Sequence, residues 1–74
     1  MDGPELSLPR LRAFLAVVKA GGFSSAARES GQSQSSLSQA VSGLEEELGQ
    51  PLFVRDRRAI HLTEAGRVLA LLQG

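Results

Sequence analysis

The sequence predicts a mainly α-helical domain with a core of three helices, a short β-hairpin and the start of a last helix. Capping residues, helical spacing of apolar residues and terminating glycines mark four helical segments. Between the third and the last of these, two brief apolar runs predict strands. The 74 residues, 42% of them hydrophobic, suffice for one small core and leave no room for a second.

The first helix is expected to begin after Ser7, whose hydroxyl can cap it. Pro9 then lies in the opening turn, where a missing N–H costs nothing. One face of this helix repeats at i, i+3, i+4 and i+7 and consists of Leu11, Phe14, Leu15 and Val18. Gly21-Gly22 predicts its end, because glycine readily adopts the left-handed conformation that follows a helix.

A second, shorter helix is expected directly afterwards. Phe23 supplies an apolar anchor before it, and Ser24 or Ser25 can cap its first turn. Gly31 breaks the pattern, so two turns are all that this helix can have.

The third helix is expected over residues 33–48. Ser33 can cap it, and Gly49 with Pro51 ends it. Its apolar residues form one stripe, made of Leu37, Val41, Leu44 and Leu48. The opposite face is uncharged and short-chained, with Ser35, Gln39 and Ser42 at its centre and Ser38 on its shoulder. An ordinary solvent-facing surface would more often carry Lys and Glu, as residues 45–47 do one turn later.

Two short strands are expected over residues 52–54 and 59–62, on either side of a charged run. Such strands are unstable alone and must pack on the helices. Thr63 can cap a last helix, with Glu64 in its first turn, where the helix dipole favours an anion. The apolar face of this helix consists of Ala65, Val68, Leu69 and Leu72.

The second helix, the turn at Gly31 and the third helix have the layout of a helix-turn-helix. Ala26 and Ala27 supply small residues where the helices cross, and Leu37 supplies an apolar residue beneath the shorter helix. The longer helix could then enter a DNA major groove, because Ser and Gln side chains bond to bases and phosphates. A plain pair of antiparallel helices has similar periodicity and remains the alternative at this point.

Eight basic and eight acidic residues balance, but they are unevenly placed. Three glutamates occupy positions 45–47, and Arg55, Arg57 and Arg58 lie within four positions of one another. From charge alone, these could equally be two solvated surface patches. A hairpin directly after a recognition helix makes a winged helix, however, and arginines at its tip can reach DNA phosphates or a minor groove. The glutamates are expected to face away from DNA.

Several function classes are disfavoured by the residues that the sequence lacks. It has no cysteine, and its single histidine, His61, has no evident partner, so neither metal ligands nor catalytic residues are expected. The longest apolar runs are far shorter than a membrane span, and residues 1–5 lack a signal-peptide profile. These observations favour a cytosolic binding module over an enzyme or a membrane protein.

From Leu11 to Leu72 the sequence resembles the N-terminal winged helix-turn-helix domain of LysR-type transcriptional regulators. The matching pieces occur in the same order and spacing: Leu11-Arg12-Ala13-Phe14, Gly22-Phe23-Ser24, Ala26-Ala27, Ser33-Gln34-Ser35, Leu37-Ser38-Gln39, Leu44-Glu45, Leu48-Gly49, Leu52-Phe53 with Arg55, and Leu62-Thr63-Glu64-Ala65-Gly66. The resemblance implies sequence-specific binding of double-stranded DNA, with residues 23–42 as the helix-turn-helix, 33–48 as the recognition helix and 52–62 as the wing.

DNA contacts are expected on the short helix, the recognition helix and the wing. The expected contact residues are Ser24, Ser25, Ser33, Gln34, Ser35, Ser36, Ser38, Gln39, Ser42, Arg55, Arg57 and Arg58. Five positions depart from the family pattern, and two of them, Ala59 and His61, lie in the wing where basic residues are common. Ser30 and Gln32 stand where apolar residues usually flank the turn, which predicts loose or hydrated packing there. Ser42 stands where a basic residue is common, which predicts weaker binding.

The resemblance also implies a domain organisation. Residues 1–7 are expected to be an N-terminal tail, 8–62 the DNA-binding domain, and 63–74 the start of a linker helix. In the family this helix pairs two subunits, which implies a homodimer through Ala65, Val68, Leu69 and Leu72. It leads to an effector-binding domain that is absent here, so no cofactor is expected in this chain and a small-molecule effector would bind elsewhere.

A cytoplasmic bacterial protein associated with the nucleoid is further implied. The competing hypothesis is a winged-helix module that binds a protein partner through the same face. The Ser-rich, neutral recognition helix is compatible with that hypothesis, but the arginine wing argues against it.

Overall fold

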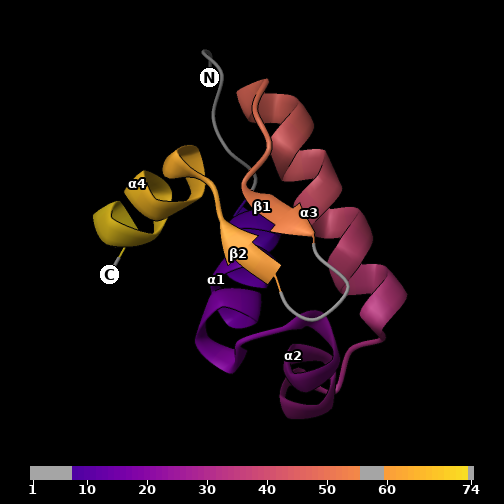
Figure 1. Ribbon diagram of the computed structural model, residues 1–74. Coiled ribbons are helices and arrows are strands. Elements are labelled where there is room, and N and C mark those ends of the chain that lie inside the picture. Colours follow the sequence, from indigo (N-terminus) through magenta and orange to yellow (C-terminus); the bar gives the residue numbers. More distant parts are fainter. Residues whose placement is uncertain (1–7, 56–59, 74) are drawn as a thin grey trace.

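Three helices pack against one another, a β-hairpin lies over them, and a fourth helix projects to one side (Figure 1). The computed structural model describes residues 8–55 and 60–73; the side chains of Arg55 and Gln73 lie outside this description. The elements are α1 (Leu8–Ala20), α2 (Phe23–Ser30), α3 (Gln34–Leu48), β1 (Phe53–Arg55), β2 (Ile60–Leu62) and α4 (Glu64–Gln73). The predicted mainly α-helical winged helix-turn-helix class is confirmed.

Helix α1 buries a face that differs slightly from the predicted one. Leu11 and Phe14 are buried as expected, but Val17 is also fully buried, while Leu15 and Val18 are only partly so. The predicted face was therefore rotated, because both α2 and α3 pack on this helix and together cover a wider arc. The helix ends as predicted: Gly21 adopts a φ of 84° and its N–H donates to the Val17 carbonyl across 2.9 Å. Ser7, the expected cap, lies outside the described residues.

Helix α2 begins one or two residues before the expected serine cap. Gly22 is its N-cap in an extended conformation and makes no side-chain capping bond, so the prediction that Ser24 or Ser25 caps the helix is wrong. Phe23 belongs to the first turn, where its ring lies 5.8 Å from that of Phe53. Packing of this ring on the hairpin favours an early helix start. The predicted length of two turns and the end at Gly31, with a φ of 75°, are confirmed.

Helix α3 matches its prediction closely. The stripe of Leu37, Val41 and Leu44 is fully buried, whereas Leu48 at the end of the helix is only half-buried. Gly49 follows in the left-handed conformation with a φ of 73°, and its N–H donates to the Glu45 carbonyl across 2.8 Å.

The hairpin is antiparallel and pairs Phe53 with Leu62, Val54 with His61 and Arg55 with Ile60. Its first strand begins one residue later than expected. Leu52, just before it, is completely buried, and its carbonyl accepts a bond across 3.0 Å from the N–H of Thr63, the residue opposite it in the same register. Ala59, the expected start of the second strand, lies outside the described residues.

An aromatic cluster joins the hairpin to the helices. The Phe53 ring lies 5.3 Å from that of Phe14 in α1, in addition to its contact with Phe23 in α2. Such tilted and edge-on pairs stabilise beyond the area that they bury. The two-stranded sheet therefore gains from these rings the support that it cannot supply alone. Within residues 8–55 and 60–73, none of the helices combines the length and apolar content that a bilayer crossing requires.

Candidate nucleic-acid interface

The N-terminal half of α3 presents a continuous polar surface to solvent. Its buried stripe faces α1 and α2, so the residues opposite are left outside. The exposed side chains of this surface, which we call the α3 polar face, are Ser33, Gln34, Ser35, Ser36, Gln39 and Ser42. Ser38 is half-buried on its shoulder, as the sequence predicted. None of these side chains carries a charge, so the face offers only hydrogen-bond donors and acceptors.

The first turn of α3 is capped by Ser33. Its hydroxyl oxygen accepts a bond from Ser36 N–H across 3.0 Å, and its carbonyl accepts one from Leu37 N–H across 3.1 Å. The N–H groups of Gln34 and Ser35 have no intrahelical acceptor at these positions. They point outward at the positive end of the helix dipole, which is an arrangement suited to a phosphate or another anion.

Two side chains of the interface contact one another. The Ser24 hydroxyl in α2 donates to Oε1 of Gln34 in α3 across 3.4 Å. Ser24 is exposed and Ser25 half-buried. The first turns of α2 and α3 are therefore neighbours, and Ser24 lies beside the start of the recognition helix.

The turn between α2 and α3 is flanked by two polar residues, Ser30 and Gln32, where the family resemblance implies apolar ones. The Ser30 hydroxyl accepts a bond from Gln32 N–H across 3.4 Å, which helps to close the turn. Both side chains are exposed and line a hollow of about 390 Å³ together with Leu8, Arg12 and Leu37. The predicted loose packing at these two positions agrees with this hollow.

The three glutamates of α3 have different surroundings. Glu45 is half-buried and accepts bonds from the N–H groups that follow the helix, whereas Glu46 is exposed. Glu47 forms an ion pair with Arg10 of α1, with 2.6 Å between the charged atoms. Eleven residues separate Ser35 from Glu46, which is about 16 Å along the helix and more than the screening length at physiological salt. Repulsion between these acids and an anion at the start of α3 is therefore weak.

The predicted wing arginines are only partly described. Arg55 ends β1 and pairs with Ile60, while Arg57 and Arg58 lie outside the described residues. His61 is exposed on β2 opposite Val54, as expected of a surface strand residue. Among the described residues, no group of three His, Cys, Asp or Glu side chains is arranged to hold a metal ion.

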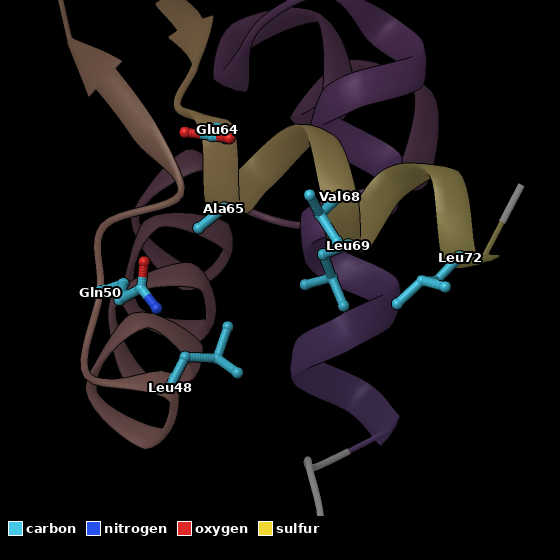
Figure 2. A pocket seen from close by; sticks show the side chains of 7 residues that line it. All are labelled: Leu48, Gln50, Glu64, Ala65, Val68, Leu69 and Leu72. Carbon is cyan, nitrogen blue, oxygen red and sulfur yellow. The ribbon is translucent and has the colours of Figure 1, made fainter.

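The predicted dimerisation residues differ strongly in exposure. Leu69 is only 9% exposed and belongs to the core of this chain, whereas Val68 is 51% and Leu72 is 75% exposed. Leu71, which was not among the predicted dimerisation residues, is 80% exposed, the highest value for a large apolar residue in the described part of the chain. Figure 2 shows Leu48, Leu69 and Leu72 directed toward one hollow between the end of α3 and α4. Its volume is about 450 Å³, and Ala65 also lines it.

Sequence reasoning missed the contacts that hold these parts together. The Arg10 guanidinium lies over Gly43 of α3, where an added Cβ would come within 2.8 Å of it. An added Cβ on Gly66 of α4 would collide with the Leu52 carbonyl oxygen. A glycine within a predicted helix indicates a close tertiary contact, because it destabilises the helix by about 1 kcal/mol relative to alanine. Its partner, however, is set by the fold.

The domain has the architecture of a winged helix-turn-helix. A short helix and a left-handed glycine turn precede a longer helix with an exposed polar face, and a hairpin follows directly. Residues 8–67 match the family described as bacterial regulatory helix-turn-helix protein, lysR family, and the chain belongs to that family.

Similar proteins and structures agree with this assignment. The transcriptional activator IlvY of Salmonella typhimurium is 47% identical over 64 residues, which are 86% of this chain and 22% of that protein. The activator AaeR of Escherichia coli is 51% identical over 61 residues, 82% of this chain and 20% of that protein. The BenM DNA-binding domain, solved in complex with catB site 1 DNA, is similar with a TM-score of 0.85 at 36% identity, over 90% of this chain and 75% of that chain. The chain thus spans about a fifth of the length of the curated relatives it matches.

Proposed function

We propose that this chain binds double-stranded DNA sequence-specifically, as the DNA-binding part of a bacterial LysR-type transcriptional regulator. The α3 polar face carries the proposal. Its hydroxyls and amides are exposed, while Leu37, Val41 and Leu44 on the other side of the helix are buried. Had these polar groups been packed inside the molecule, no surface of α3 would be left for a duplex. A domain solved on DNA, that of BenM, has a similar fold.

The recognition helix acts in the major groove. Gln34 and Gln39 have side-chain amides that can bond to adenine at two points, and serine hydroxyls bond to bases or phosphates. The N-terminal N–H groups of α3 suit a backbone phosphate. Ser24 and Ser25, at the start of α2, are proposed to contact the adjacent backbone. Ser42 offers a hydroxyl where a basic residue would add a charged contact, so binding through α3 is weak for a domain of this class.

The wing supplies the charged contacts. Arg55, Arg57 and Arg58 are proposed to reach the backbone or the minor groove beside the site that α3 occupies. Each phosphate that they neutralise lowers the slope of log K against log salt concentration by about 0.9. With about 3–5 phosphate contacts in each subunit, from the wing and the rest of the domain together, a dimer has a slope of several units.

Two copies are proposed to pair through α4. Val68, Leu71 and Leu72 lie at i, i+3 and i+4 and are largely exposed, so they form an apolar face that this chain leaves uncovered. Ala65 and Leu69 support that face from the inner side. Pairing would place two recognition helices about one DNA turn apart, or a multiple of it, on an inverted-repeat site. In the longer protein, the helix is proposed to continue toward an effector-binding domain.

We infer a binding role and no catalytic one for this segment. His61 is exposed on β2 opposite Val54, and the similar proteins named above are regulators. The small-molecule effector, if the parent protein senses one, belongs to the part of the regulator beyond this chain.

Selection of bound sequences from a random duplex pool tests the proposal most directly. The expected result is an enriched, inverted-repeat motif whose affinity falls steeply with salt. A module that binds only protein partners would enrich no sequence and would show negligible affinity for duplex DNA at any ionic strength, which would overturn the proposal.

A further inference from the structure

The end of α3, the base of the hairpin and the start of α4 meet at residues 51–53. On one side, Oε2 of Glu45 accepts bonds from Leu52 N–H across 2.7 Å and from Phe53 N–H across 3.3 Å. On the other side, Thr63 N–H donates to the Leu52 carbonyl across 3.0 Å, and the Thr63 hydroxyl donates to the Pro51 carbonyl across 2.7 Å. The base of the hairpin is therefore hydrogen-bonded on both edges, and on the α3 side its backbone N–H groups bond to the Glu45 carboxylate. Leu52 and Phe53 also pack in the core beside the buried stripe of α3.

The Glu45 bonds are of the strong kind. A carboxylate that accepts from backbone N–H groups makes charge-assisted bonds, which are roughly twice as strong as neutral ones. Both bonds are part-buried, so water competes poorly for them. The backbone carbonyl of the same residue accepts bonds from Gly49 N–H and Gln50 N–H. Glu45 thus organises the whole connection between α3 and β1.

Position along α3 makes this contact relevant to binding. Glu45 lies six residues after Gln39 of the α3 polar face, which is about 9 Å along the helix. Phe53 begins β1, and the wing arginines start two residues later, at Arg55. The Glu45 carboxylate therefore adds a direct hydrogen-bonded link between the recognition helix and the base of the wing, in addition to the core packing of Phe53.

The neighbouring acids do not share this role. Glu46 is exposed, and Glu47 pairs with Arg10 of α1. Glu45 differs from both, because its carboxylate accepts bonds from the hairpin N–H groups.

We propose that Glu45 is a positioning residue for DNA binding: it holds the wing at a fixed angle to the recognition helix, so that both elements engage DNA together. This inference rests on the proposed function. A wing that is already oriented adds its contacts without the entropic cost of ordering it on the duplex. Without Glu45, the helix and the wing bind as two loosely coupled parts, and the wing arginines add little.

A double-mutant cycle tests the proposal on the full chain. Affinity for the selected duplex is measured at one salt concentration for the wild type, Glu45→Ala, the wing variant Arg55→Ala/Arg58→Ala, and their combination. The wing substitutions are expected to weaken wild-type binding about tenfold, as two arginine contacts would. In the Glu45→Ala background they are expected to weaken it less than about twofold, because coupled residues are non-additive.

Two further variants separate positioning from charge and from folding. Glu46→Ala, which removes an exposed acid one residue away, should leave the tenfold effect of the wing substitutions intact. Glu45→Gln, which keeps one oxygen acceptor, should restore most of the coupling. If Glu45→Ala does not fold, as judged by circular dichroism, Glu45→Asp takes its place, because its carboxylate is one methylene too short to reach both N–H groups.

A readout without DNA accompanies the cycle. In the wild type, residual dipolar couplings of the β1 and β2 amides should fit the same alignment frame as those of α3, whereas in Glu45→Ala the fit of these amides to that frame should worsen. If the wild type binds no duplex, the proposed function fails and this inference fails with it. If the wild type binds but the wing substitutions cost the same in both backgrounds, only the positioning role of Glu45 is overturned.

Discussion

The Ser24 hydroxyl of α2 donates to the side-chain oxygen of Gln34 in α3 across 3.4 Å. This bond joins the first turns of the two helices of the helix-turn-helix at the solvent surface. This bond engages one lone pair of the Gln34 oxygen and so orients the amide, and it leaves the second lone pair and the NH₂ group for an outside partner. Ser24 therefore acts on the α3 polar face through Gln34, besides any contact of its own.

Ser24→Ala is expected to weaken duplex binding about threefold, since a neutral exposed bond contributes on the order of 0.5–1.5 kcal/mol. Thermal stability should hardly change, because both side chains are exposed. Anisotropy titrations measure the effect, and Gln34→Ala supplies the control background. If Ser24→Ala costs the same affinity when Gln34 is absent, Ser24 does not act through Gln34.

Ser33→Ala is expected to lower the free energy of unfolding by about 1 kcal/mol, because it removes the acceptor of Ser36 N–H at the start of α3. In a domain of this size the melting temperature should fall by about 4–8 °C. Ser35→Ala, on the exposed side of the same turn, is the matched control and should change the melting temperature little. Equal effects of the two substitutions would show that the cap is not the cause.

Alanine substitution should change the free energy of unfolding differently at the two helical glycines that have close neighbours, Gly43 and Gly66. Gly66→Ala places a Cβ against the Leu52 carbonyl, which belongs to a bonded backbone segment, and should cost about 1–3 kcal/mol. Gly43→Ala meets the Arg10 side chain, which can move at the cost of an exposed ion pair of about 0–1 kcal/mol. The gain in helix propensity, about 1 kcal/mol, should offset that loss. Urea unfolding measures both; a Gly43 variant as unstable as the Gly66 variant would contradict this reasoning.

Replacing Arg55 and Arg58 with alanine should flatten the plot of log K against log salt by about 2 units for each subunit, because two phosphate contacts are lost. The fold should be unchanged, since the residues that form the described core are all apolar. Binding measured between low and moderate salt decides the outcome. An unchanged slope would show that the wing makes no phosphate contact.

Self-association should depend on the outer face of α4 and stability on its inner face. Leu71→Ser/Leu72→Ser removes exposed apolar surface and should abolish dimers while leaving the melting temperature nearly unchanged. Leu69→Ala opens the core and should cost about 2–4 kcal/mol. Sedimentation equilibrium and thermal melts separate the two effects. A wild type that stays monomeric at high concentration would contradict pairing through α4.

Features that depend on neighbours along the chain could be predicted from the sequence. The left-handed glycines at positions 21, 31 and 49, the caps at Ser33 and Thr63 and the buried stripe of α3 all follow from helix periodicity and backbone sterics. The exposed α3 polar face follows from the same periodicity, because a helix that buries one side must expose the other.

Features that depend on contacts between distant segments could not be predicted from the sequence. Phe23 joins α2 because its ring packs on Phe53, thirty positions away in the chain. Val17 is buried because two helices cover α1. The pattern of α4 groups Leu69 with Leu72, yet only Leu69 is taken into the core. Glu45 appears in the sequence as one of three like charges, and it is distinguished from its neighbours only where the chain returns after Pro51 to present two N–H groups to it. Periodicity decides which side of a helix is apolar; which groups then meet across the molecule is decided by the packing of the helices and the hairpin.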